Sequence, residues 1–582
     1  MDRPSQLKYV NVRAFVAVFG PGPQPGKVIR EVCGVTTGRF RLGSAQVTFV
    51  GRGDEPEAID GSVTSLVLCT GRPFFEDRLF EGGVVPRADE LDGKFARLVL
   101  DARRLELSTD CIGAGGAFYA QQGGRLYVGS HLGLLLEALP HVPSMNDLGI
   151  AAHLLVRAQI FDQTHFDGVY RLPAGGVLSA ETGLDDNVDL RVTPGRGIKA
   201  LLDIDTPSLA PESFRELLDS SVERERYDRD SVLMLSGGYD SYSIALARAH
   251  VPTRAATYGE RYSIDFVRGR RRARRLGMEF LPVPYEDWNL ETYRDLIVGL
   301  NAGSSGLQTA HNVIAFDWLS DKANLASIGF IGDVYRGKIL DKLDKGPHET
   351  TAPPILMRKS EDPILSEVFA DEKKLVGEFA MDRFSDWSRD VGPHRSLSMM
   401  KLEWQQGREF SMLFDLCDWF VPSSYPLMHR QLLASWLQAD LADVRCRQVF
   451  KLALGQSLAE RGFNTDYRDG FGGRLWVRSL AATAALVRGK RTALRCDWQA
   501  VIKRSKTPFT QVTCRHRRLS DLTNRAWQRY LAGEDRSPIA IAYRSGAMVA
   551  AHERFLTQDS GPSASVDPVT ELPRYAASRA TV

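Results

Sequence analysis

The residues with the clearest chemical potential lie at 235–241, where an apolar run ends in the sequence LSGGYDS. Gly237 and Gly238 lack side chains, so the backbone can turn sharply there and approach an oxyanion. The segment 239–250 predicts a helix, whose first N–H groups point outward with a partial positive charge. This order predicts a phosphate-binding loop. Its assigned members are Leu235, Ser236, Gly237, Gly238, Asp240 and Ser241, with the two serines as hydroxyl donors.

Asp240 adds a further requirement, because a carboxylate repels phosphate unless a cation lies between them. Mg²⁺ prefers oxygen ligands and is the expected bridge. The spacing is neither GxxxxGK[ST] nor GxGxxG, which excludes the Walker and Rossmann loops. A plain Gly-Gly turn without a ligand is the alternative, and the order of strand, SGGxDS and helix favours the phosphate loop.

The elements that must position this loop change along the chain. Residues 1–185 contain short β-type runs, such as AFVAVFG and SLVLCTG, separated by glycines, which predicts an antiparallel sheet. A polar, proline-containing linker is predicted at 186–210. In 211–484 strands alternate with helices, which predicts a parallel sheet. The fold class is therefore α+β followed by α/β, with a basic helical extension at 485–557 and a disordered tail at 558–582.

Composition is that of a globular protein, with 582 residues, 43% hydrophobic and 25% charged. The net charge of +2 argues against general nucleic-acid binding. The seven cysteines never occur as CxxC, which favours reduced thiols over disulfides or zinc. No apolar run reaches about 18 residues, so no membrane span is expected. The charged N-terminus lacks an apolar signal region, and a cytoplasmic protein is predicted.

The SGGYDS segment is similar to the SGGxDS pyrophosphate loop of the ATP-pyrophosphatase superfamily, which cleaves ATP between its α and β phosphates. Within it, the chain most resembles the asparagine synthetase family, over about residues 85–455. LDGKFARLVLDARRLELSTDCIGAGG and HFDGVYRLPAGG resemble that family's amidotransferase domain. The resemblance implies an Ntn-amidotransferase-like domain at 1–185 and an adenine nucleotide α-hydrolase-like synthetase domain at 211–484. It also implies ATP and Mg²⁺ as cofactors.

A second loop, IGFIGDVYRG at 328–337, occupies the place of the family's SGEGADELFGG loop. Gly329 and Gly332 match its glycines. Asp333 matches its second metal-binding aspartate, beside Asp240.

The segment RQVFKLAL resembles the family stretch that carries a lysine facing the reaction centre. Arg447 takes the position of that lysine and Lys451 that of a later arginine. The two are four residues apart and would share a helix face. Arginine does not shuttle protons near neutral pH, so Arg447 would only stabilise charge. The alternative for Lys451 is a surface salt bridge.

The chain departs from the family where glutamine is hydrolysed. Glutamine-dependent members start with a nucleophilic cysteine exposed by removal of Met1, but here residue 2 is Asp2 and the first cysteine is Cys33. Thr109 stands where the family usually has arginine, before Asp110. The first domain is therefore predicted to lack glutaminase activity and to be a retained scaffold.

Family members without the cysteine include β-lactam-type synthetases and lasso-peptide cyclases, which use an amine of the same molecule. Phe330 stands where the β-lactam-type enzymes have tyrosine, and its flat apolar ring favours a peptide substrate. The expected activity is adenylation of a peptide side-chain carboxylate for attack by the peptide's N-terminal amine, releasing AMP and pyrophosphate. The alternatives are an asparagine synthetase-like or β-lactam-type synthetase acting on a small amino acid, and a non-catalytic scaffold. Implied partners are a precursor peptide, a leader peptidase and a leader-binding protein.

Two basic segments remain. Six arginines at 268–275 are expected to form the solvated face of a helix, with nucleic-acid binding as the alternative. The basic stretch 488–530 would dock an acidic partner or leader peptide, or form a solvated helix pair.

Overall fold

The computed structural model describes most of the chain. Asp2, Cys33, the segment 462–515 and the tail 558–582 lie outside the described part, so the predictions made on them stay predictions. The described residues are 7–20, 31–32, 35–52, 63–82, 85–183, 187–207, 210–259, 261, 263–283, 293–304, 310–335, 363–439, 445–461, 516–531 and 537–556.

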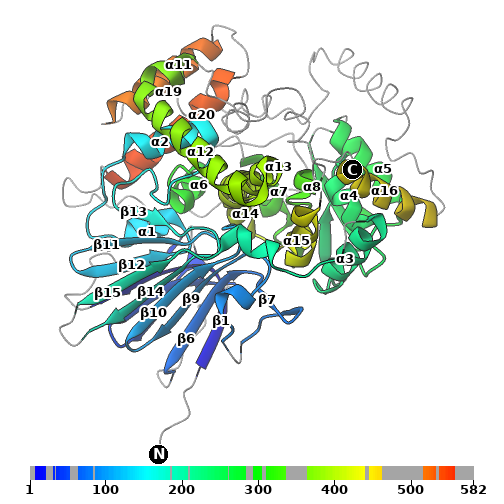
Figure 1. Cartoon of the computed structure of the whole chain (residues 1–582), viewed down its shortest axis with the longest axis horizontal. Coiled ribbons are helices and arrows are strands. Elements are labelled where there is room, and N and C mark those ends of the chain that lie inside the picture. The colour runs from blue at the N-terminus through cyan, green and yellow to red at the C-terminus, as the bar shows by residue number, and fades with distance from the viewer. Residues whose placement is uncertain are drawn as a thin grey trace, which may run out of the picture.

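The first part of the chain forms an 11-stranded sheet, with a central order β13-β11-β12-β1-β6-β9-β10-β14-β15 and β5 pairing with both β1 and β4. Figure 1 shows this sheet as a layer below the helices. The strands are β1 (Leu7–Phe19), β4 (Gly38–Leu42), β5 (Ala45–Gly51), β6 (Ser65–Gly71), β9 (Phe95–Asp101), β10 (Arg104–Thr109), β11 (Phe118–Gln122), β12 (Arg125–Gly129), β13 (Val169–Arg171), β14 (Val177–Thr182) and β15 (Val188–Thr193). Short pairs β2–β3 (Glu31–Val32, Val35–Thr36) and β7–β8 (Phe74–Phe75, Arg78–Leu79) stand apart.

The antiparallel prediction holds for the pairs of this sheet except one, because β1 runs parallel to β6, from Leu7 opposite Ser65 to Asn11 opposite Cys69. β1 is 13 residues long, so its first half pairs with β6 while its second half pairs with β5 and β12. The linker prediction also needs correction at 188–193, which forms β15 antiparallel to β14. Alternating apolar residues such as Leu190 and Val192 pack against the sheet's core and hold this edge strand.

The second part contains a five-stranded parallel sheet of order β18-β17-β16-β19-β20, as the sequence predicts for this region. Its strands are β16 (Ser231–Met234), β17 (Arg254–Tyr258), β18 (Glu279–Val283), β19 (Leu325–Ser327) and β20 (Ser423–Ser424). The chain leaves β16 towards β17 and β18, then returns to place β19 on the other side of β16. The strand order therefore reverses between β16 and β19, the position where open α/β sheets bind ligands.

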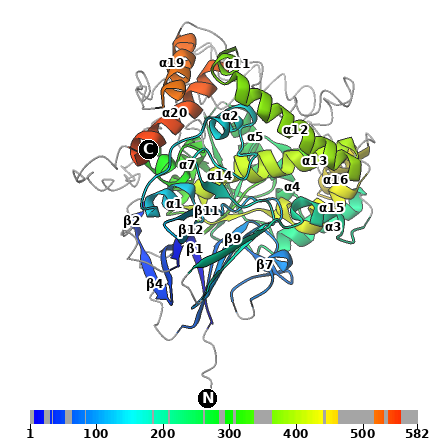
Figure 2. The same cartoon turned by 60° about the vertical axis from the view of Figure 1, so that its left-hand side comes forward.

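Helices cover the parallel sheet and join it to the first part (Figure 2). They are α1 (Leu132–Ala138), α2 (Asp147–Val156), α3 (Pro211–Glu223), α4 (Tyr239–Ala245), α5 (Ile264–Arg275), α6 (Arg294–Asn301), α7 (Ala310–Leu319), α8 (Gly332–Tyr335), α11 (Pro363–Val368), α12 (Ala370–Val391), α13 (Pro393–Met400), a π-helix (Lys401–Phe410), α14 (Ser411–Asp418), α15 (Arg430–Gln438), α16 (Arg445–Glu460), α19 (Arg517–Leu531) and α20 (Ser537–Leu556). In the described ranges, 3₁₀ turns lie at Ala88–Glu90, Gly197–Leu202 and Pro426–Met428. Within the described ranges, none of the helices combines the length and apolar character that crossing a bilayer needs.

The two parts are packed closely enough for their backbones to touch. A Cβ atom on Gly133 of α1 would lie 1.8 Å from the carbonyl oxygen of Gly299 in α6. A Cβ atom on Gly407 of the π-helix would lie 1.9 Å from the carbonyl oxygen of Ile112. Neither glycine leaves room for a side chain, so the first part fixes the position of helices that belong to the second.

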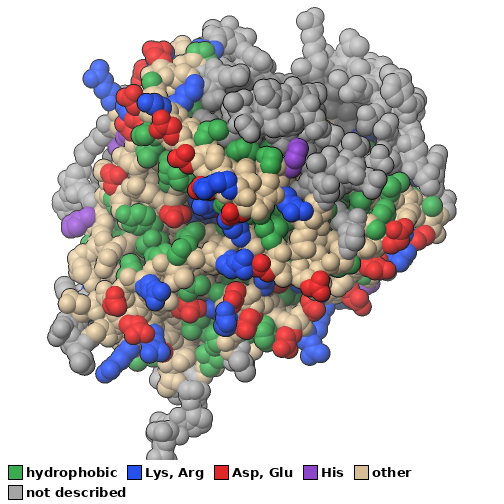
Figure 3. Space-filling view, in the orientation of Figure 1, with side chains coloured by type: hydrophobic (Ala, Val, Ile, Leu, Met, Phe, Trp, Pro, Cys, Tyr) green, Lys and Arg blue, Asp and Glu red, His purple; other side chains and the backbone are tan. Residues whose placement is uncertain are grey.

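On the face shown in Figure 3, the Lys and Arg side chains of the described residues lie among Asp and Glu side chains. This mixture accords with the near-neutral net charge of +2.

Candidate functional site

The two glycine loops of the sequence come together at the reversal point of the parallel sheet. β16 and β19 are adjacent and parallel, with Leu233 opposite Ser327. The first loop begins at Leu235, directly after β16, and the second begins at Ile328, directly after β19. Because the carboxyl ends of both strands meet at one edge, residues nearly a hundred positions apart become neighbours.

Glycine is what allows this contact. A Cβ atom on Gly332 would lie 2.3 Å from Cβ and 2.4 Å from Cγ of Asp240, and one on Gly329 would lie 2.6 Å from the backbone nitrogen of Ser241. Both predicted glycines therefore press the second loop against the residues of the first. Ile331, between them, has a φ of 72°, which is an outlier for a β-branched side chain. Strained backbone of this kind clusters at functional sites.

The two serines shape the first loop from within. The Ser236 N–H donates to Ser241 Oγ over 3.1 Å, and the Gly238 N–H donates to Ser236 Oγ over 3.1 Å. The predicted role of these hydroxyls as phosphate donors is thus joined by a second role, as acceptors that hold the turn. α4 ends at Ala245, earlier than the helix predicted to reach His250, because the chain must return to start β17 at Arg254.

Two carboxylates are candidates for holding a divalent cation. Asp240 lies in the first turn of α4, against the backbone of Gly332. Asp333 is the next residue after Gly332 in the second loop. For Asp333 the structure describes the backbone alone. In the described ranges no cluster of three or more His, Cys, Asp or Glu side chains is found. Mg²⁺ is commonly bound by one or two carboxylates together with substrate phosphates. Asp240 places one carboxylate at the contact between the loops, and the role of Asp333 stays a prediction.

The contact between the loops leads to a prediction for Gly332. We expect Gly332→Ala to displace the Asp240 carboxyl group, because the new methyl group would overlap its Cβ and Cγ atoms. Changes that disturb the support of a metal ligand cost about 10–100-fold in metal affinity or activity. Titration of ATP binding against Mg²⁺ concentration checks this. Gly377→Ala on α12, where a Cβ atom meets nothing within 4 Å, is the matched control. Equal Mg²⁺ dependence in the two variants would contradict the prediction.

Sequence reasoning missed one residue at this site. Arg272 belongs to the arginine run that was expected to be solvated, and Arg270, Arg271 and Arg274 are indeed exposed. Arg272 is instead buried, with 4% of its surface exposed, and donates to carbonyl oxygens of the first loop. The signal was its helical spacing from buried Phe266 and Gly269, which places position 272 on the inner face.

The predicted cationic pair lies on α16, so the helical prediction for this segment is confirmed. α16 contacts α3 and also α8, the short helix that carries Asp333. For Arg447 and Lys451 the structure describes the backbone alone, and their roles stay predictions.

Phe330 does not face an open site. Its side chain is 4% exposed and packs edge-on against Phe414 at 4.7 Å and Tyr425 at 5.7 Å between ring centroids. The interpretation of Phe330 as a surface for a peptide substrate is therefore wrong. An aromatic ring at this loop position is accounted for by packing between β19 and α14.

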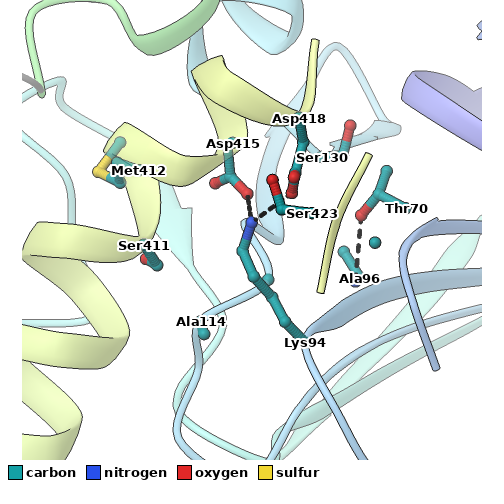
Figure 4. Close-up of polar contacts among 12 residues, drawn as sticks. Thr70, Lys94, Ala96, Ala114, Ser130, Ser411, Met412, Asp415, Asp418 and Ser423 are labelled. Carbon is teal, nitrogen blue, oxygen red and sulfur yellow. Dashed lines mark hydrogen bonds and ion pairs between the residues drawn. The ribbon is translucent and has the colours of Figure 1, made fainter. Parts of the chain in front are cut away.

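A polar pocket lies between the sheet of the first part and α14 (Figure 4). The Lys94 Nζ atom lies 2.6 Å from Asp415 Oδ1 and 2.9 Å from Asp418 Oδ2. Burial lowers the pKa of Lys94, but the two carboxylates outweigh it and hold that pKa well above its usual value. The Tyr425 hydroxyl donates to Asp418 over 3.1 Å, which connects this cluster to the ring beside Phe330. The lining residues are Arg13, Arg52, Thr70, Gly71, Lys94, Gly115, Ser130, His131, Asp415 and Asp418.

Thr109 and Asp110, which mark the departure from the glutamine-dependent pattern, both organise a loop. Thr109 Oγ1 donates to the carbonyl oxygen of Gly115 over 2.7 Å. The Asp110 carboxylate accepts N–H groups from Ala114 at 3.0 Å and Gly115 at 2.6 Å, while burial raises its pKa. These contacts are those of a structural turn.

The three cysteines that the structure describes in detail are Cys69, Cys111 and Cys417. Burial raises the pKa of all three thiols, to about 12 for Cys69. Because the thiolate is the nucleophilic form, these described thiols are held in their unreactive state.

Comparisons with known proteins give little. The sequence matches no family model, and no curated protein matches it. Solved structures similar to this chain include one titled as the allosteric regulatory enzyme of purine biosynthesis, with 10% identity and a TM-score of 0.18 over 47% of this chain and 75% of that one. Another is the glutamine phosphoribosylpyrophosphate amidotransferase from B. subtilis complexed with ADP and GMP, with 9% identity and a TM-score of 0.18 over 55% of this chain and 76% of that one. Likeness at this TM-score carries no inference about this chain.

Proposed function

We propose that this protein is an ATP-dependent ligase that forms an amide bond and releases AMP and pyrophosphate. The observation that carries the proposal is the meeting of the two glycine loops around Asp240, at the reversal point of the parallel sheet. The SGGYDS loop would hold the leaving pyrophosphate through backbone N–H groups and serine hydroxyls. Asp240 and Asp333 would hold Mg²⁺, which neutralises phosphate charge when bound.

The proposed reaction has two balanced steps. A substrate carboxylate attacks the α-phosphorus of ATP, and the bond to the β-phosphate oxygen breaks to release pyrophosphate. An amine then attacks the activated acyl carbon, loses a proton, and displaces AMP. Arg447 and Lys451, on one face of α16, are the proposed cations for the charge that develops on the acyl oxygen.

The finer proposal is that acid and amine belong to one peptide, so that the product is a macrolactam. Support comes from the sequence resemblance to lasso-peptide cyclases. Holding both ends of one chain together would supply much of the rate, because oriented intramolecular reactions avoid several kcal/mol of entropic barrier. Burial of Phe330 removes one reason for preferring a peptide, and a synthetase acting on a small amino acid is the second candidate.

ATP labelled at the α-phosphate, which reports AMP or ADP, and ATP labelled at the γ-phosphate, which reports pyrophosphate or phosphate, together test the reaction class. With Mg²⁺ and a suitable substrate, we expect AMP and pyrophosphate in equal amounts; ADP and phosphate would contradict the proposal. A linear peptide with an acidic side chain and a free N-terminus should lose the mass of one water and its reactive amine if the product is a macrolactam. Nucleotide turnover with free amino acids alone would favour the second candidate, and binding without turnover of any substrate would favour the scaffold.

A further inference from the structure

The underside of the phosphate loop is occupied by a buried guanidinium. Arg272 Nη1 donates to the carbonyl oxygen of Gly238 over 2.6 Å and to that of Ser236 over 3.2 Å. Its guanidinium carbon lies 4.1 Å from the centre of the Tyr242 ring, within cation–π range. Arg272 thus contacts two alternate carbonyl groups of the loop and, through the Tyr242 ring, helix α4 that follows the loop.

These two hydrogen bonds fix the direction of two peptide planes. In a trans peptide the carbonyl and the N–H of the same plane point in opposite directions, and the described residues contain no cis peptide. The Ser236 carbonyl shares its plane with the Gly237 N–H, and the Gly238 carbonyl shares its plane with the Tyr239 N–H. Because both carbonyls turn towards Arg272, both N–H groups turn away from it.

The intervening planes are fixed by other groups. The N–H groups of Ser236 and Gly238 donate to the hydroxyl oxygens of Ser241 and Ser236. The loop therefore has alternating supports, with side-chain hydroxyls holding one set of N–H groups and Arg272 orienting the other. A loop that presents N–H groups in one direction is the form that binds phosphate oxygens.

The fold brings Arg272 to this position through a glycine. A Cβ atom on Gly269, one turn earlier on α5, would lie 2.4 Å from both the Leu235 carbonyl oxygen and Thr257 Oγ1. α5 can therefore approach the end of β16 closely enough for the guanidinium to reach under the loop. Lysine would supply the charge, but its point-like ammonium lacks the planar fork that stacks on Tyr242.

We propose that Arg272 is a positioning residue for phosphate binding, which orients the Gly237 and Tyr239 N–H groups towards the ATP that this loop is proposed to bind. The inference rests on the proposed function, since it concerns the same nucleotide. The positive charge of Arg272 lies on the side of the loop opposite the proposed phosphates. There it polarises both peptide groups so that their N–H groups become stronger donors.

The test compares Arg272→Met with Arg271→Met, which changes an exposed arginine of the same helix. Dissociation constants are measured by calorimetry for ATP with Mg²⁺, inorganic pyrophosphate and adenosine. We expect Arg272→Met to weaken ATP and pyrophosphate about 10- to 100-fold. Adenosine binding should stay unchanged, and Arg272→Lys should be intermediate. The Arg271→Met variant should match the wild type for every probe.

Equal affinities for pyrophosphate in Arg272→Met and Arg271→Met would overturn the inference. A uniform loss that includes adenosine would also overturn it, because that pattern indicates a structural role alone. If Arg272→Met does not fold, the same comparison is made with Arg272→Lys. A loss of pyrophosphate affinity without a loss of adenosine affinity then supports the inference, and any other pattern overturns it. A wild-type protein that binds neither ATP nor pyrophosphate would instead refute the proposed function itself.

Discussion

Asp240→Asn is expected to lower pyrophosphate release at least about 100-fold, the scale on which one preorganised electrostatic group acts in catalysis. The carboxylate lies against the second glycine loop, where it would hold Mg²⁺ between itself and the phosphates. The amide keeps the shape of the side chain but lacks the charge that binds the cation. The loss should therefore appear in both turnover and Mg²⁺ dependence.

The same substitution should have the opposite effect once the metal is removed. In EDTA the wild-type carboxylate repels the triphosphate, whereas the amide does not, so Asp240→Asn should bind ATP more tightly than the wild type under those conditions. Calorimetric titration with and without Mg²⁺ measures both values. Asp230→Asn, an exposed carboxylate just before the start of β16, is the matched control and should behave as the wild type. An unchanged Mg²⁺ dependence in Asp240→Asn would refute the metal-binding role.

The largest effect on stability is expected for Lys94→Met. Lys94 is 2% exposed and lies between the carboxylates of Asp415 and Asp418, which themselves are only 15% and 12% exposed. Removing the cation leaves the two partly buried carboxylates without their positive partner. Breaking a buried ion pair in this way lowers the free energy of unfolding by about 3–5 kcal/mol. The expected result is a clear fall in the midpoint of chemical unfolding at neutral pH.

Two further variants separate this effect from a general loss of packing. Lys374→Met removes an exposed partner of Glu378 on α12, a surface pair 3.9 Å apart, and should shift the midpoint very little. The triple variant Lys94→Met, Asp415→Asn, Asp418→Asn should recover much of the loss, because the two carboxylate charges are removed together with the cation. If Lys94→Met and Lys374→Met unfold at the same midpoint, the ion cluster does not stabilise the junction between the two parts.

Local sequence was sufficient for the strands of the parallel sheet around the first loop. Runs such as SVLMLS, TRAATYG and MEFLPVPY predict strands, and they form β16, β17 and β18 of the parallel sheet. The order of strand, SGGYDS and helix predicts the first loop from the residues themselves, whereas the second loop, IGFIGDVYRG, follows only from the resemblance to the asparagine synthetase family. The close approach of Gly332 to Asp240 is a finding of the structure.

Other features could not be read from local patterns. β1 looks like any antiparallel strand, and its parallel pairing with β6 depends on which partner each half meets. The six arginines at 268–275 carry the same charge, so only helical spacing from Phe266 and Gly269 distinguishes Arg272, and the structure shows that those two positions are buried. Phe330 looks the same whether it faces a substrate or the ring of Phe414.

The sequence by itself thus determined that a strand, a glycine loop and a carboxylate recur in the order of a phosphate site, because turn geometry and strand propensity act over a few residues. Only the tertiary structure decided that Arg272 supports the loop, that Phe330 is packed, and that Lys94 meets Asp415 and Asp418. Those outcomes depend on close approach between segments far apart in the chain, as where Gly269 lets α5 approach Leu235 and Thr257. Burial and charge pairing at such contacts are properties of the packed fold.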